Sequence, residues 1–231
     1  MHCLKIISVT VLLSLLLVAC PRSGGDGHSG PDIVIKGLGV DFAAYDVGTG
    51  KAGDFIFTES PPSPYKVFFE FGAIVSTGSG TKALPTFEYR IDKTAEVKSI
   101  ADGVVDRIYT NSGGDFEIIV HYSQNEQFFV VYDHVINITV GVGSTITAGQ
   151  VLGNPGVWDE TYGRFEIMVN NYSTGLSYCP FVYFDPSSRA NYEEKVNLFI
   201  QEWESFKGDS TIYDEANYDY AGCSMNNMVS Y

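Results

Sequence analysis

The chain has 231 residues, of which 45% are hydrophobic, and a formal net charge of -14 at pH 7. A surface this acidic would repel phosphates, so the composition excludes nucleic acid as an expected partner. The charge also argues against non-specific adhesion to anionic lipids or polymers. The hydrophobic content is high enough for a packed core, and the length suits one domain with a small appendage.

The first 19 residues have the pattern of a lipoprotein signal peptide. Lys5 precedes an apolar run, residues 6–17, which is too short to cross a bilayer as a helix. The run ends in Leu-Val-Ala-Cys, which resembles a bacterial lipobox, so we expect cleavage before Cys20 and lipidation of its thiol. An ordinary secretory signal is the alternative. The lipid chains on Cys20 would anchor the protein to a membrane of the cell envelope.

Residues 20–30 follow the signal and are rich in glycine and serine, which is typical of a flexible tether. Residues 31–80 contain short β-prone runs at 34–36, 54–57 and 66–71, separated by Gly, Pro and Ser clusters. We interpret this region as an N-terminal β extension that packs on the main body.

Residues 81–186 carry the clearest β pattern of the chain. Runs rich in β-branched and aromatic residues occur at 104–109, 116–122 and 127–132, with glycines in the turns between strands. Short strands joined by glycine turns predict an antiparallel sheet, sandwich or barrel. The expected fold class is therefore mainly β.

Residues 187–231 are expected to hold one helix and an acidic tail. Apolar residues recur at steps of three and four between 187 and 207, and Gly208 can end the helix. The stripe consists of Tyr192, Val196, Phe199, Trp203 and Phe206. It is expected to pack on the sheet. The tail after Gly208 is rich in tyrosine, and little regular structure is expected there.

Two cysteines lie in this C-terminal half. Cys179 and Cys223 can form a disulfide in an exported protein, which would stabilise the fold by about 2–4 kcal/mol. Two buried free thiols are the alternative. No Cys-x-x-Cys spacing is present, which argues against a thiolate metal site.

Five segments between residues 87 and 167 occur in an order that points to a known family. They read FEYRID at 87–92, IADGVV at 100–105, YDHV at 132–135, AGQVLG at 148–153 and GRFEI at 163–167. Their order, spacing and turn residues resemble the lysostaphin/LytM-type zinc endopeptidases, which cut peptidoglycan cross-bridges. The resemblance implies a β domain built from hybrid-motif hairpins.

The resemblance also assigns roles to single positions. Asp92 matches the family's aspartate ligand, whereas Glu88 replaces the ligand histidine four residues before it. His134 matches a histidine that assists catalysis. In the family's His-x-His motif, Tyr162 replaces the first histidine, which assists, and Arg164 replaces the second, which binds zinc.

A guanidinium group stays protonated and cannot bind a cation, so Arg164 is expected to pair with Asp92 or Glu88. We therefore expect no cofactor and a degenerate, non-enzymatic domain that binds peptidoglycan or an envelope protein. One alternative is an active zinc endopeptidase with Glu88 and Asp92 on the metal and His134 in catalysis. Another is a plain binding or structural lipoprotein.

Overall fold

The computed structural model describes residues 32–61, 65–78, 80–224 and 226–231. The signal sequence, Cys20 and the tether lie outside these residues, so their assignments remain predictions. Among the described residues no helix is both long and apolar enough to cross a membrane.

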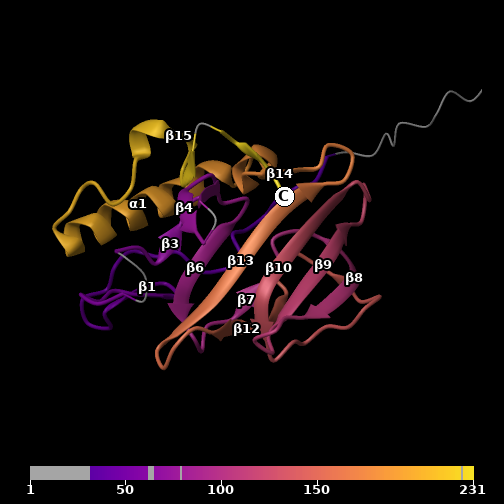
Figure 1. Cartoon of the computed structure of the whole chain (residues 1–231), viewed down its shortest axis with the longest axis horizontal. Helices are drawn as coiled ribbons and strands as arrows, with labels where there is room; N and C mark the ends of the chain where they lie inside the picture. Colours follow the sequence, from indigo (N-terminus) through magenta and orange to yellow (C-terminus); the bar gives the residue numbers. More distant parts are fainter. Residues whose placement is uncertain (1–31, 62–64, 79, 225) are drawn as a thin grey trace, which may run out of the picture.

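The main sheet has eleven strands in the described part of the chain, and all of their pairings are antiparallel. Its central strands run in the order β8–β9–β10–β13–β6–β3 (Figure 1). The strands are β3 (Phe68–Phe69), β6 (Phe87–Asp92), β7 (Val97–Lys98), β8 (Gly103–Thr110), β9 (Phe116–Tyr122), β10 (Phe128–Ile136), β11 (Thr145–Ile146), β12 (Val151–Val157), β13 (Tyr162–Asn171), β14 (Leu176–Tyr178) and β17 (Met228–Ser230).

Three small two-stranded sheets complete the β structure of the described residues. They are β1 (Lys51–Ala52) with β2 (Phe55–Ile56), β4 (Ile74–Thr77) with β5 (Gly80–Ala83), and β15 (Tyr218–Tyr220) with β16 (Cys223–Ser224). Two short 3-10 helices, η1 (Pro180–Tyr183) and η2 (Glu215–Asn217), lie in the C-terminal part. The predicted mainly β, antiparallel class is confirmed.

The N-terminal strands are joined to the main sheet. Strand β3 pairs with β6, so Phe68 lies opposite Tyr89 and both are fully buried. Ile35 and Phe55 belong to the same core as Phe165 of β13. Because the region shares both hydrogen bonds and core with the sheet, it can position residues of a site on β6.

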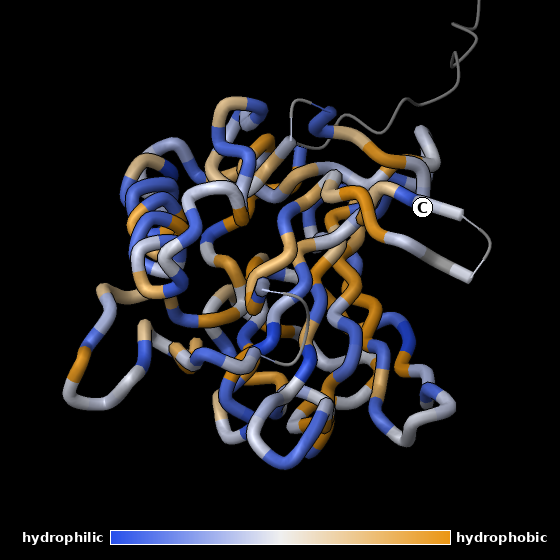
Figure 2. Tube along the Cα trace, turned by 60° about the vertical axis from the view of Figure 1, so that its left-hand side comes forward, coloured by the Kyte–Doolittle hydropathy of each residue, from blue (hydrophilic) through white to orange (hydrophobic). Residues whose placement is uncertain are grey.

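Helix α1 (Arg189–Lys207) lies on the side of the molecule that holds β3, away from β8 and β9 (Figure 1). Its trace alternates between hydrophilic and hydrophobic colours (Figure 2), as expected for a helix with one face on the core. Val196, Phe199 and Trp203 of the predicted stripe are buried. The helix ends at Gly208, whose φ of 65° is the left-handed conformation that glycine adopts without strain.

The C-terminal tail is more regular than its composition predicts. A buried disulfide joins Cys179 to Cys223, with the two Cα atoms 6.1 Å apart. Strand β17 pairs with β14, and Cys223 also forms a bridge with Phe71. The expectation of little regular structure after Gly208 was therefore wrong, because covalent and non-local contacts fix this segment.

Candidate functional site

Three neighbouring strands bring charged side chains together on the face of the sheet opposite the core. In β6, Phe87, Tyr89 and Ile91 are fully buried in the core, so the alternating Glu88 and Arg90 point to the other face. The register places Glu166 of β13 opposite Glu88, and Arg164 opposite Arg90. We call Glu88, Arg90, Arg164 and Glu166 the charge cluster.

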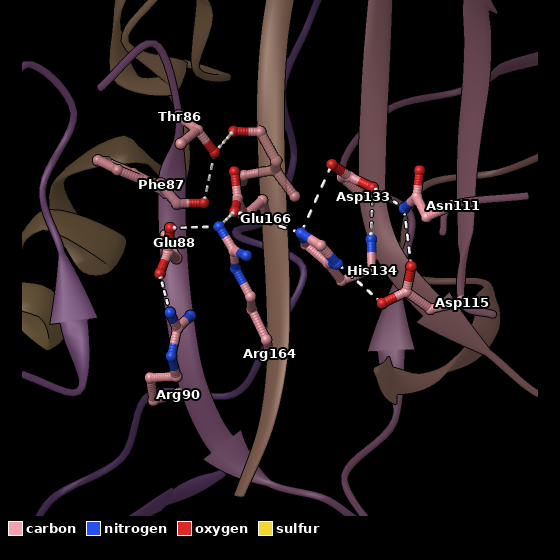
Figure 3. A network of polar contacts seen from close by, with 11 residues as sticks. Thr86, Phe87, Glu88, Arg90, Asn111, Asp115, Asp133, His134, Arg164 and Glu166 are labelled. Carbon is pink, nitrogen blue, oxygen red and sulfur yellow. Dashed lines mark hydrogen bonds and ion pairs between the residues drawn. The ribbon is translucent and has the colours of Figure 1, made fainter. Parts of the chain in front are cut away.

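The charge cluster is held by ion pairs that cross the β6–β13 ladder (Figure 3). Arg164 Nη2 donates to Glu88 Oε2 over 3.1 Å and also contacts Glu166 Oε1. Glu88 Oε1 pairs with Arg90 Nη2. The carboxylate of Glu88 therefore bridges two guanidinium groups, and Arg164 pairs with Glu88, one of its two predicted partners, while Asp92 pairs elsewhere.

The two carboxyl groups of the cluster have different pKa values for physical reasons. Burial would raise the pKa of Glu88, but the charges of Arg90 and Arg164 outweigh burial and hold that pKa below its usual range. Burial raises the pKa of Glu166 to about 8, and the neighbouring charge of Glu88 adds to the effect. Glu88 is therefore the ionised member at neutral pH, while Glu166 retains its proton more readily.

His134 lies beside the cluster, on β10. Its Nδ1 is 2.8 Å from Asp115 Oδ2, and its Nε2 is 3.7 Å from both Glu166 Oε1 and Asp133 Oδ2. Asn111 donates to Asp115 Oδ1 over 2.7 Å and to Asp133 Oδ1 over 2.8 Å. The positive backbone φ of His134, 58°, coincides with the register shift between β9 and β10. The ring of His134 points toward Asp115 and Glu166 (Figure 3).

Two aromatic rings flank Arg90. The centroid of the Trp158 ring lies 3.9 Å from the Arg90 guanidinium carbon, and that of Phe69 lies 5.6 Å from it. Trp158 is also 5.8 Å from the guanidinium carbon of Arg164, and it remains 43% exposed. Such contacts between cations and ring faces are attractive, so the cluster combines ion pairs with an aromatic wall.

Asp92 takes no part in the charge cluster. Its carboxylate pairs with Lys51 Nζ at 2.6 Å and accepts hydrogen bonds from the backbone and hydroxyl of Thr94. Residues 87–92 pair with β13 without a register shift, so Glu88 and Asp92 are about 13 Å apart along an extended strand. Tyr162 lies opposite Asp92 in this register.

The alternative ligand set is therefore not assembled. Glu88 and Asp92 cannot both reach one zinc ion, because zinc–oxygen bonds are only about 2.0–2.2 Å long. Among the described residues no group of three or more His, Cys, Asp or Glu side chains is arranged to hold a metal ion. At the second ligand position Arg164 offers N–H donors and no lone pair. The residues present do not fit a catalytic zinc ion.

Sequence reasoning missed four residues of this site, which are Arg90, Asn111, Asp115 and Trp158. Asn111 and Asp115 bracket a glycine turn between β8 and β9, where polar residues are common for conformational reasons alone. Trp158 lies in the turn before β13, and its partial exposure becomes apparent only in the structure.

Part of the chain is similar to known proteins. Residues 86–174 match the model of peptidase family M23. No functionally curated protein matches the chain. Among solved structures, the chain is similar to the antimicrobial peptidase lysostaphin from Staphylococcus simulans, with 22% identity and a TM-score of 0.41 over 53% of this chain and 50% of that one.

Two further structures are similar. The catalytic domain of the prophage-encoded M23 protein EnpA from Enterococcus faecalis, solved as a variant, has 16% identity and a TM-score of 0.35 over 48% of this chain and 86% of that one. LytU has 19% identity and a TM-score of 0.38 over 45% of this chain and 72% of that one. The present chain spans about half the length of full lysostaphin. The family match spans residues 86–174 and includes the positions of Glu88, Asp92, His134, Tyr162 and Arg164, so this part of the chain is similar to peptidase family M23.

Proposed function

We propose that this protein is an exported, membrane-anchored bacterial lipoprotein whose M23 domain binds peptidoglycan without zinc and without cleaving it. The observation that carries the proposal is the ion pair between Arg164 and Glu88. These residues occupy two positions at which the family has zinc-binding histidines. In this chain the side chains at the two positions form an ion pair with each other.

Zinc binding would require the ion pairs of Arg164 with Glu88 and Glu166 to break. The site needs three protein ligands and an open position for water, but Arg164 brings a positive charge to one ligand position. Moving Arg164 aside would leave Glu88 and Glu166 with one cation fewer in a site where both are nearly buried. Breaking a buried ion pair costs about 3–5 kcal/mol, and Arg164 is 30% exposed, so the cost here is at the low end.

Binding is the activity that this site retains. Trp158 and Arg164 are both partly exposed at its edge, and together they offer an aromatic face and a charged fork to a ligand. Peptidoglycan is the proposed ligand because enzymes of the lysostaphin/LytM type act on it. A fold alone does not fix a function, so the choice of ligand depends on the site and on that family relationship.

The location follows from two features. The Leu-Val-Ala-Cys sequence at 17–20 is the expected lipidation signal. The disulfide between Cys179 and Cys223 suits an oxidising compartment outside the cytoplasm. Both support a protein of the cell envelope, with lipidated Cys20 as its anchor.

A sedimentation assay tests the proposed function. The chain from residue 21 onward is mixed with insoluble bacterial peptidoglycan, and the pellet is analysed for bound protein and the supernatant for released peptides. We expect the protein in the pellet and no released peptides, with or without added zinc. Release of peptides that a chelator abolishes would show an active zinc endopeptidase. Protein that stays in the supernatant would exclude peptidoglycan as the ligand and leave an envelope protein as the partner.

A further inference from the structure

The arginines of the charge cluster have more hydrogen-bond donors than the protein gives them partners. Each guanidinium carries five N–H groups. The recorded ion pairs of Arg90 and Arg164 within the cluster use their Nη2 atoms. Nε and Nη1 of Arg90 and Nε of Arg164 are buried and have no hydrogen-bond partner.

Unpartnered donors of this kind need an explanation. Leaving a buried donor unsatisfied costs free energy, and native structures contain few such groups. Arg90 is only 4% exposed, so bulk water does not satisfy its Nε and Nη1. The cluster therefore contains donor groups of two positive side chains that an additional acceptor would satisfy.

The carboxylates of the site do not satisfy these donors. Both oxygens of Glu88 pair with the Nη2 atoms of the two arginines. Glu166 Oε1 contacts only Arg164 Nη2 within the cluster and has no further hydrogen-bond partner. Asp115 and Asp133 accept from Asn111 and lie beside His134. Among the described residues nothing accepts from Nε and Nη1 of Arg90 or from Nε of Arg164, so an acceptor from outside the protein would satisfy them.

The cluster is also reachable from solvent. The side chain of Arg164 is 30% exposed, and Trp158, whose ring lies over Arg90, is 43% exposed. Rotation of one partly exposed side chain, Trp158, would change how Arg90 is covered without moving the backbone of β6 or β13. The backbone N–H groups of Trp158 and Asp159 both donate to the carbonyl oxygen of Tyr162. These hydrogen bonds fix the backbone around Trp158.

We propose that the charge cluster is a carboxylate-binding site, in which Arg164 and Arg90 receive the free α-carboxylate of a peptide beside the ring of Trp158. A planar guanidinium matches the two oxygens of a carboxylate in a bidentate pair. The inference rests on the proposed function and makes it more specific, because it names the group of a cell-wall peptide that the domain recognises. The position that binds zinc in the family would bind an anion here.

Calorimetric titration of the soluble chain tests this site. The probe is N-acetyl-D-alanyl-D-alanine with a free carboxylate, and the matched probe is its C-terminal amide. We expect the amide to bind at least tenfold more weakly, since a charge-assisted hydrogen bond is lost. Arg164→Gln should weaken binding of the acid at least tenfold. Arg107→Gln should leave it unchanged, because Arg107 is an exposed arginine that pairs with Asp106.

Tryptophan fluorescence gives a second readout. The chain has two tryptophans, and Trp203 is a residue of α1 that is fully buried in the core. A fluorescence change on adding the acid should therefore come from Trp158 and should be lost in Trp158→Phe. Circular dichroism of Arg164→Gln checks its fold, and Arg164→Lys is a milder variant that keeps the charge and loses the planar fork.

Each outcome is decisive for one of the two proposals. Equal binding of acid and amide, no binding of the acid at millimolar concentration, or unchanged binding in folded Arg164→Gln and Arg164→Lys would overturn the carboxylate site. If the protein still sedimented with peptidoglycan, the proposed function would stand and only the site would be wrong. If the acid bound and the protein did not sediment, the site would stand and peptidoglycan would be the wrong ligand.

Discussion

Arg164 of β13 reaches across to β6 and donates from Nη2 to Glu88 Oε2 over 3.1 Å. In the lysostaphin/LytM-type zinc endopeptidases, which this region resembles, histidines stand at both positions and bind the metal. In the present chain β6 and β13 pair without a register shift, and a direct ion pair joins the two positions. The positive charge at the centre of the site is thus supplied by the protein itself.

Replacing Arg164 by glutamine should destabilise the protein. Glu88 and Glu166 would lose a charged donor while remaining nearly buried, which we expect to cost about 1–3 kcal/mol. Urea denaturation of the chain from residue 21 onward measures the free energy of unfolding. Arg107→Gln is the matched control and should behave like the wild type, since Arg107 is exposed. Equal stability of all three proteins would contradict a structural role for the Arg164–Glu88 pair.

Glu166 should make the stability depend on pH. Its pKa is about 8 in the folded protein and 4.5 without perturbation, so the folded state favours the protonated form. The associated stabilisation is fully present below about pH 4.5 and is lost as the pH rises through about 8. The free energy of unfolding of the wild type should therefore fall over this range relative to that of Glu166→Gln. Parallel curves for the two proteins would show that Glu166 is ionised throughout.

Trp158 should contribute to stability through its contact with Arg90. Replacement by leucine removes the ring face that lies 3.9 Å from the guanidinium carbon, and we expect a loss of about 0.5–2 kcal/mol. Trp158→Phe should lose less, because a phenyl face keeps part of the attraction. The denaturant midpoints measure this difference in unfolding free energy, provided that its dependence on denaturant concentration is the same in each protein. Val157→Ala serves as the control at a neighbouring, 68% exposed position, and a Leu variant as stable as this control would argue against the contact.

The disulfide should hold the tail to the body of the protein. It closes a span of 44 residues between Cys179 and Cys223, and removal of such a link costs about 2–4 kcal/mol. The double variant Cys179→Ser, Cys223→Ser should unfold at a correspondingly lower denaturant concentration. Wild-type protein treated with a reductant should shift in the same direction. A double variant with unchanged stability would mean that packing alone fixes the tail.

The strands of the central sheet are predicted well from the sequence, because alternation of apolar residues and turn glycines are local patterns. Alternation and turn glycines place strands at 104–109 and 116–122, and the structure has them at 103–110 and 116–122. Helix α1 begins two residues later than predicted and ends before the expected Gly208. The pairing of β3 with β6 was not predicted, because partner choice between distant strands leaves little trace in either segment.

The site was predicted only in part, for a similar reason. The chemistry of a guanidinium predicts that Arg164 pairs with a carboxylate. The register places Arg164 opposite Arg90, midway between Glu88 and Asp92, and the pairing of Asp92 with Lys51, which no local pattern predicts, leaves Glu88 as the partner. Three residues of regular strand separate Asp92 from Glu88, so two acids that are close in sequence are far apart in space. The contact of Trp158 with Arg90 depends on the hairpin between β12 and β13, and no sequence pattern encodes it.

The most direct test of the central claim is the zinc content of the chain from residue 21 onward, purified without chelator and then titrated with zinc at micromolar concentration. The Arg164–Glu88 pair predicts no stoichiometric zinc before or after titration, and no effect of a chelator on the free energy of unfolding. About one zinc ion per chain, lost in Asp92→Ala, would contradict the claim. That result would show that Asp92 binds a metal, and peptidoglycan hydrolysis would be the next activity to measure.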